Sequence, residues 1–137
     1  MNRRKLLQQT GLSLIFCVTG CLDSNQSGNA EAAQTPDPNH QIQIENEISD
    51  PATVTVSVLR EKTGKTVYNQ TYTLQPNETV TAYNTQQANP DGIEEFNVSV
   101  TSGGSTDSFT LETDQCMGDV IARVTESDGI DMVYSIC

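Results

Sequence analysis

From residue 40 onward, apolar and polar residues alternate along the sequence with a period of two. Ile42 and Ile44 are flanked by polar residues, and Val54, Val56 and Val58 follow the same pattern. Successive side chains of a β-strand point to opposite faces, so this alternation predicts strands with one buried face and one face in water. Such strands must pack their apolar face against a second layer.

The same alternation recurs in six further segments, 66–74, 80–83, 96–100, 109–111, 119–126 and 130–136. Between segments the chain carries turn signals: Asp50-Pro51, Thr63-Gly64, Pro76-Asn77, Pro90-Asp91-Gly92 and Gly103-Gly104. No window shows sustained helical spacing. The pattern predicts an all-β fold, a two-sheet sandwich of seven to eight strands over residues 40–137, because a single sheet would leave its apolar face wet.

The N-terminus has the pattern of an export signal over residues 1–20. Arg3, Arg4 and Lys5 precede a short apolar run, 11–18, which is too short to span a bilayer stably. The paired arginines resemble a twin-arginine signal, which exports proteins that are already folded. The alternative is an ordinary positively charged signal start.

A lipidation motif closes this segment. Val18, Thr19 and Gly20 precede Cys21, in the order aliphatic, small, Gly, Cys. The chain here resembles a lipoprotein precursor, and this resemblance implies that Cys21 becomes the lipidated first residue after cleavage, anchored in the membrane. The alternative is ordinary secretion with Cys21 left as a free thiol.

A polar segment follows, and it divides the chain into three parts. Residues 22–39 are rich in Ser, Asn, Gly, Pro and Ala and contain almost no large apolar residue. Such a segment cannot bury a core, so we expect a flexible, disordered linker. The expected organisation is a signal peptide at 1–20, a lipidated cysteine and linker at 21–39, and the sandwich domain at 40–137.

The chain is strongly acidic. It contains 7 Lys and Arg against 18 Asp and Glu, with a formal charge of −11. Removing residues 1–20 leaves 4 cations against 18 acids, so the charge becomes −14. Nucleic acid is therefore excluded as a partner, because phosphate binding needs clustered cations. The composition and signal resemble secreted proteins of halophilic archaea; the alternative is any acidic extracytoplasmic protein.

The domain resembles the immunoglobulin-like modules of haloarchaeal surface lipoproteins. The resemblance rests on the IENE segment at 44–47, the TLQPNETV segment at 73–80, and the terminal hairpin bounded by Cys116 and Cys137. An antibody-type domain would also carry a Trp between two core cysteines, and this chain has no Trp. The resemblance therefore concerns architecture only.

Two cysteines remain in the mature chain once Cys17 leaves with the signal and Cys21 takes the lipid. Cys116 and Cys137 pair by elimination, because an exported chain meets an oxidising compartment. They also lie at the two feet of a predicted hairpin that turns at Asp128-Gly129. The alternative, two buried free thiols, fits an intracellular protein better.

Four sequons mark candidate N-glycosylation sites at Asn25, Asn69, Asn77 and Asn97. Asn77 is the best candidate because it follows Pro76 in a predicted turn. Asn25 lies in the linker, and Asn97 should point outward because its neighbours point inward.

No residue pattern indicates catalysis, a metal or a cofactor. His40 is the only histidine and we expect it to be solvated at the edge of a strand. A blue-copper site needs two His beside its Cys and Met, so Cys116-Met117 does not provide one. Acids cluster at Asp91, Glu94 and Glu95 and again at Glu126, Asp128 and Asp131, where we expect solvated surface charge rather than a calcium site.

These features predict a non-catalytic protein, lipid-anchored on the extracytoplasmic face of the cell membrane, whose sandwich binds a surface protein or glycan. One alternative is an accessory or substrate-capture subunit of a membrane transporter or envelope enzyme. The other is a small carboxylate-based enzyme, which would need two acids facing each other across a cleft.

Overall fold

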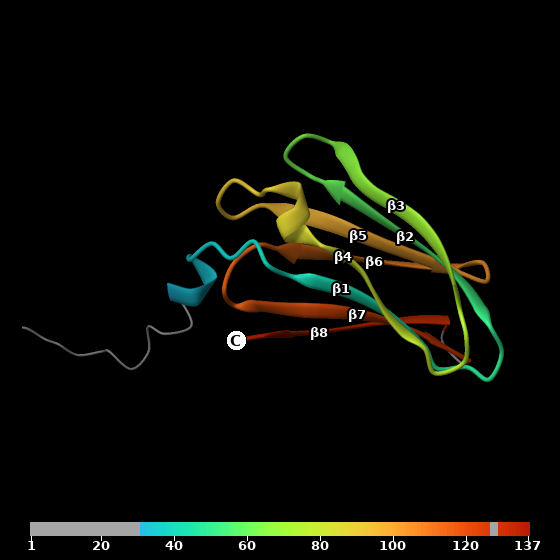
Figure 1. The fold of residues 1–137 in the computed structure, drawn as a ribbon. Helices are drawn as coiled ribbons and strands as arrows, with labels where there is room; N and C mark the ends of the chain where they lie inside the picture. The colour runs from blue at the N-terminus through green and yellow to red at the C-terminus, as the bar shows by residue number, and fades with distance from the viewer. Residues whose placement is uncertain (1–30, 127–128) are drawn as a thin grey trace, which may run out of the picture.

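The computed structural model describes residues 31–126 and 129–137, which form a β-sandwich of two four-stranded sheets (Figure 1). The strands are β1 (Gln41–Asn46), β2 (Ala52–Arg60), β3 (Lys65–Leu74), β4 (Thr79–Asn84), β5 (Glu95–Ser102), β6 (Ser105–Glu112), β7 (Met117–Thr125) and β8 (Gly129–Ile136). A short 3-10 helix, η1 (Thr85–Ala88), follows β4. The predicted two-sheet sandwich is confirmed.

The two sheets have the strand orders β4-β1-β7-β8 and β3-β2-β5-β6. Neighbouring strands run antiparallel, except that β1 and β7 are parallel. An immunoglobulin constant domain places its first, second, fourth and fifth strands in one sheet. Here the first strand shares a sheet with the fourth, seventh and eighth. The likeness to immunoglobulin modules is therefore one of architecture, and the strand order is different.

The core lies between the sheets and is built from the alternating apolar residues. Pairing places Val56 opposite Val100 and Val58 opposite Val98 in one sheet, and Ile42 opposite Val120 in the other. All six side chains are fully buried. Burial of a side chain of this size stabilises the fold by about 1.5–3 kcal/mol, so the period-two pattern supplies most of the driving force.

Aromatic pairs close the two long sides of the sandwich. Tyr68 of β3 packs on Tyr83 of β4, with ring centroids 4.7 Å apart. On the other side, Phe109 of β6 packs on Tyr134 of β8 at 4.2 Å. Each pair joins an edge strand of one sheet to an edge strand of the other, so the rings cover the core where no backbone pairing connects the sheets.

The sandwich has two ends with different loops. Segments 31–40, 61–64, 85–94 and 113–116 lie at one end together with the C-terminus, which we call the linker end (Figure 1). Loops 47–51, 75–78 and 103–104 lie at the opposite end, together with the end of β7 and the start of β8, and we call it the loop end.

Asn46 holds two connections together at the loop end. Its Nδ2 donates to the carbonyl oxygens of Asp50 at 2.8 Å and Leu74 at 3.2 Å, and its Oδ1 accepts from the Ile48 amide at 3.1 Å. Its backbone carbonyl accepts a further bond from the Asn77 amide at 2.8 Å. The side chain is fully buried, so it fixes the β1–β2 loop against the end of β3 in the other sheet.

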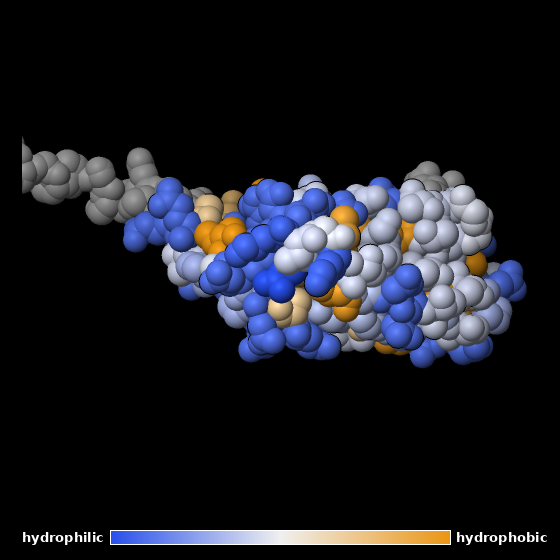
Figure 2. Space-filling model, turned by 90° about the horizontal axis from the view of Figure 1, so that it is seen from above, coloured by the Kyte–Doolittle hydropathy of each residue, from blue (hydrophilic) through white to orange (hydrophobic). Residues whose placement is uncertain are grey.

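The surface is mostly polar. On the face seen from above, apolar residues form small separate patches among hydrophilic ones (Figure 2). The exposed large apolar side chains of the described residues are Ile93, Tyr134 and Ile136.

Candidate functional site

The segment before β1 lies against the linker end. The Gln115 amide donates to the carbonyls of Ala32 and Thr35, and the Asp37 amide donates to Thr113 at 2.9 Å. Pro36 forms an isolated bridge with Asp114. Residues 32–39 are predicted to belong to a flexible linker, but several of their backbone groups are bound to the domain. Backbone hydrogen bonds do not depend on apolar side chains, so the composition of residues 32–39 does not predict them.

His40 is buried, with 2% of its surface exposed, so the prediction of a solvated histidine is wrong. The reason is the docking of the preceding residues: Thr85 Oγ1 donates to the Pro38 carbonyl at 2.7 Å, and the Thr85 amide donates to the His40 carbonyl at 3.0 Å. These bonds hold residues 38–40 against the start of η1. His40 Nε2 has no hydrogen-bond partner among the described residues.

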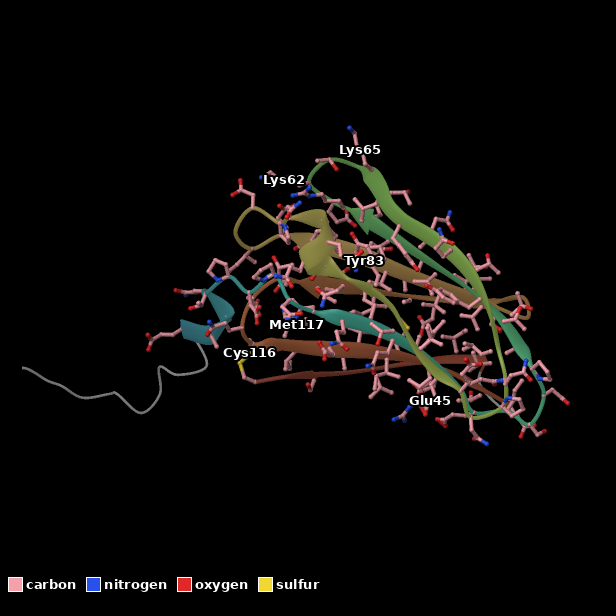
Figure 3. The ribbon with its side chains drawn as sticks, in the orientation of Figure 1. Glu45, Lys62, Lys65, Tyr83, Cys116 and Met117 are labelled. Atoms are coloured by element: carbon pink, nitrogen blue, oxygen red, sulfur yellow. A yellow bond between two sulfur atoms is a disulfide. The ribbon has the colours of Figure 1, made fainter. Side chains whose placement is uncertain are left out.

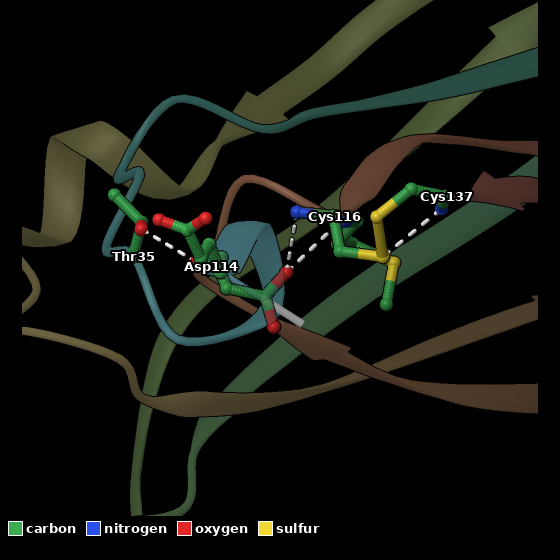
Figure 4. The surroundings of a disulfide bond; sticks show 6 residues. Thr35, Asp114, Cys116 and Cys137 are labelled. Atoms are coloured by element: carbon green, nitrogen blue, oxygen red, sulfur yellow. Dashed lines mark hydrogen bonds between the residues drawn. A yellow bond between two sulfur atoms is a disulfide. The ribbon is translucent and has the colours of Figure 1, made fainter. Parts of the chain in front are cut away.

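A disulfide joins Cys116 to Cys137 at the linker end, with their Cα atoms 4.9 Å apart (Figure 4). This is the pairing that the sequence predicts. Asp114 orients the first cysteine, because its Oδ1 accepts from the amides of Cys116 and Met117, both at 2.9 Å. The Cys137 amide donates to the Cys116 carbonyl at 3.0 Å, so the chain terminus is held to the start of β7.

An ion pair lies at the end of β2, which is also at the linker end. Arg60 Nε donates to Glu94 Oε1 at 2.7 Å and Nη2 donates to Oε2 at 2.6 Å. The Glu94 carboxylate is 3% exposed, so it is not the solvated acid that the sequence analysis expects. The guanidinium group lowers the pKa of Glu94 to about 2. Lys62 contacts Asp91 nearby at 3.4 Å, and Figure 3 shows Lys62 and Lys65 projecting from the β2–β3 turn.

The loop end contains a pocket of about 590 Å³. It lies between the sheets and is lined by Ile48, Ser102, Gly103, Ser105, Val124, Thr125, Glu126 and Gly129. Gly129 has a φ of +79°, and a Cβ at this position would lie 2.6 Å from Ser105 Oγ. The close approach of β8 to β6 therefore requires glycine here.

The lining of this pocket combines apolar side chains with hydroxyl groups and a carboxylate. Ile48 and Val124 supply apolar surface, while Ser105 and Thr125 supply hydroxyl groups and Glu126 a carboxylate. Its volume is within the range of small-ligand pockets. The lining residues come from three separate connections, so no local sequence pattern predicts the pocket. The only local signal is the set of small residues around Gly103-Gly104 and Gly129.

Three sequons fall within the described residues. Asn77 is exposed in the turn between β3 and β4 and has a φ of 65°, as expected for a residue at a tight turn. Asn69 is exposed on the edge strand β3. Asn97 lies on β5 between the buried residues Phe96 and Val98, so it faces outward as predicted.

Within the described ranges, no three His, Cys, Asp or Glu residues are arranged to hold a metal ion. The helices in the same part of the chain lack the length and apolarity of a membrane span.

Several predicted sites lie outside the described residues. They are Arg3 and Arg4, the motif Val18, Thr19, Gly20 and Cys21, and the sequon at Asn25. The signal peptide, the lipid anchor and residues 21–30 of the linker therefore stay predictions.

Comparison with known proteins found no matching protein-family model, curated protein or solved structure.

Proposed function

We propose that the chain is a non-catalytic surface lipoprotein, anchored through Cys21 on the extracytoplasmic face of the membrane, that displays a β-sandwich binding module. The observation that supports this proposal is that the two ends of the domain differ. Residues 32–39 enter at one end, and the 590 Å³ pocket opens at the other.

This arrangement suits a module that is held at one end and binds at the other. An anchor preceding residue 31 would place the linker end toward the membrane and leave the loop end facing outward. Binding residues are commonly carried on loops that a rigid scaffold positions. Here the scaffold is the two-sheet core, and Asn46 fixes the loop beside Ile48, one of the pocket residues.

The pocket chemistry favours a small polar group of a partner as the ligand. Hydroxyl groups donate and accept hydrogen bonds, and the Glu126 carboxylate accepts them. Ile48 and Val124 add apolar contact. A polar group with a small apolar part, such as a sugar or a short side chain of a surface protein, would fit this lining.

The anchor is tested by comparing two cysteine variants in cells labelled with a lipid precursor. We expect Cys21→Ser to lose both the lipid label and retention in the membrane fraction. The matched control Cys17→Ser changes a cysteine of the same segment outside the motif and should keep both. Recovery of the wild-type protein in the cytosol with its original N-terminus would overturn the proposal.

Binding at the loop end is tested by placing a photo-crosslinking residue at Glu126, in the pocket, or at Glu61, at the linker end. We expect one defined partner, identified by mass spectrometry on intact cells, to crosslink at Glu126 and not at Glu61. Equal crosslinking at both positions, or none at either, would argue against a binding site in the pocket.

A further inference from the structure

The outer face of the β3-β2-β5-β6 sheet carries a block of uncharged residues, nearly all polar, which we call the hydroxyl face. Strand pairing aligns its side chains in three rows across the four strands. The rows are Thr71, Thr55, Thr101 and Thr106; Asn69, Ser57, Ser99 and Ser108; and Thr66, Leu59, Asn97 and Thr110. Eleven of these twelve residues are Thr, Ser or Asn, and none is charged.

Alternation along the strands places these residues outward. The residues between them on the central strands, such as Val56, Val58 and Val98, are fully buried in the core. Two neighbouring pairs in the first row are joined by hydrogen bonds. The hydroxyls of Thr55 and Thr71 are 3.0 Å apart, and those of Thr101 and Thr106 are 2.9 Å apart. Each bonded pair uses one hydroxyl hydrogen, so each keeps a second donor and free lone pairs.

The absence of charge is confined to these three rows, because the next pair on the same outer face, toward the linker end, is the exposed Glu95 and Glu112. The outer face of the β4-β1-β7-β8 sheet carries Glu45, Asp119, Arg123 and Asp131 at its outward positions. The hydroxyl face lies in the same strongly acidic chain and contains no such residue in its three rows. Acids therefore lie on both outer faces, and the uncharged area is the continuous block of twelve residues in the three rows.

We propose that the hydroxyl face binds an uncharged glycan chain carried by another molecule. A lattice of hydroxyl and amide groups both donates and accepts hydrogen bonds, which matches the hydroxyl groups of a neutral sugar polymer. Because the face has no cation, it offers nothing to a sulfated or carboxylated glycan. Hydrogen bonds between neutral groups are also insensitive to the salt that screens charged contacts.

The size of the array favours a chain molecule over a second copy of the protein. Strands about 4.8 Å apart and alternate residues about 6.8 Å apart give a face of about 400 Å² once side-chain margins are included. A stable protein interface needs about 800 Å² from each partner. A flat strip of half that area suits a linear polymer lying across the strands.

The test is native electrophoresis of the full-length protein, as cells produce it, in gels containing mannan or dextran as neutral probes and alginate as the acidic probe. We expect retardation by at least one neutral polysaccharide, none by alginate, and no loss of retardation between about 0.1 M and 1 M salt. Retardation by alginate, or by none of the three, would overturn the proposal.

A pair of valine variants tests the face itself. Thr55→Val with Thr101→Val removes two hydroxyls but keeps the branched shape that strands favour, and we expect about a tenfold weaker affinity. The matched control is Thr79→Val with Thr81→Val on exposed positions of β4 in the other sheet, which should bind normally. Equal losses in both variants, with unchanged thermal unfolding, would contradict a role for the face.

Two further measurements separate other occupants. Sedimentation that shows a dimer dissociated by Thr55→Val with Thr101→Val would assign the face to a second copy. An intact mass showing sugar attached at Asn69 or Asn97, both on this face, would mean that the face carries a glycan instead of binding one. A Glu126→Lys variant changes only the loop-end pocket. If this variant still binds the polysaccharide, the glycan site on the hydroxyl face is separate from the pocket of the proposed function.

Discussion

Arg60 and Glu94 form a two-pronged ion pair that ties the loop before β5 to the end of β2. Both carboxylate oxygens accept from the guanidinium group, at 2.7 Å and 2.6 Å. The same guanidinium donates to the carbonyl oxygens of Ala88 at 3.2 Å and Asn89 at 3.3 Å. One side chain therefore satisfies four acceptors and fixes the whole 85–94 segment at the linker end.

This pair makes stability depend on pH in the acid range. Hydrogen bonding from Arg60 lowers the pKa of Glu94 from 4.5 to about 2. A carboxylate whose pKa is lowered by folding stabilises the native state fully above its unfolded pKa. We therefore expect the contribution of Glu94 to be complete above pH 4.5 and to disappear as the pH falls toward 2.

The measurement is the free energy of unfolding of wild type and Glu94→Gln as a function of pH. The difference between them should be constant above pH 4.5 and shrink below it. Glu112→Gln, at an exposed position of β6, is the matched control and should leave the free energy nearly unchanged at neutral pH. A difference for Glu94→Gln that stays constant down to pH 2 would contradict the lowered pKa.

Asn46 provides a second test of the buried polar contacts. Asn46→Ala removes three side-chain hydrogen bonds and leaves the carbonyls of Asp50 and Leu74 without this donor. We expect a loss of about 2–4 kcal/mol in the free energy of unfolding, measured with urea. Asn97→Ala, on the outer face of β5, should cost less than about 0.5 kcal/mol. Similar losses for the two variants would argue against the role of Asn46.

The fold is predictable from the sequence because its cause is local. Residues such as Val54 and Val56 alternate with threonines, and the strand follows from that period without knowledge of any partner. Strand order does not follow in this way. The parallel pairing of β1 with β7 joins residues nearly eighty positions apart, and no local pattern in either strand specifies it.

The sites are less predictable because they depend on contacts between distant segments. Glu94 lies in an acidic run that resembles solvated surface charge, and only its approach to Arg60 across the fold makes it a buried ion pair. The hydroxyl face likewise appears in the sequence only as the polar half of four separate strands. Its rows exist once pairing brings Thr55, Thr101 and Thr106 side by side.

The disulfide should contribute substantially to stability. It closes a loop of sequence separation 21, for which chain entropy gives about 3 kcal/mol. We expect the double variant Cys116→Ser with Cys137→Ser to lose about that amount in urea unfolding. Intact mass under non-reducing conditions supplies the control, since the oxidised protein is two hydrogens lighter than the reduced one. A mass without that deficit would show that the bond is absent.

Tyr68 and Tyr83 provide a test at high pH. Burial raises the pKa of both side chains above 10.0, and for Tyr68 the hydrogen bond with Tyr72 raises the pKa further. A tyrosine whose pKa is raised by folding stabilises the native state fully below its unfolded pKa, and this contribution is lost as the pH rises through the folded value. The ultraviolet absorbance of tyrosinate should therefore show a late step that coincides with alkaline unfolding measured by circular dichroism.

Tyr68→Phe separates this explanation from general alkaline denaturation, because it keeps the ring against Tyr83 and removes one hydroxyl. The late absorbance step should then become smaller, whereas Tyr134→Phe, at a half-exposed position, should leave it unchanged. If the late step had the same size in wild type and Tyr68→Phe, the ring pair at the β3–β4 side would not shield this hydroxyl from solvent. In that case, the covering of the core at this side of the sandwich would depend on the packing of Tyr83 alone.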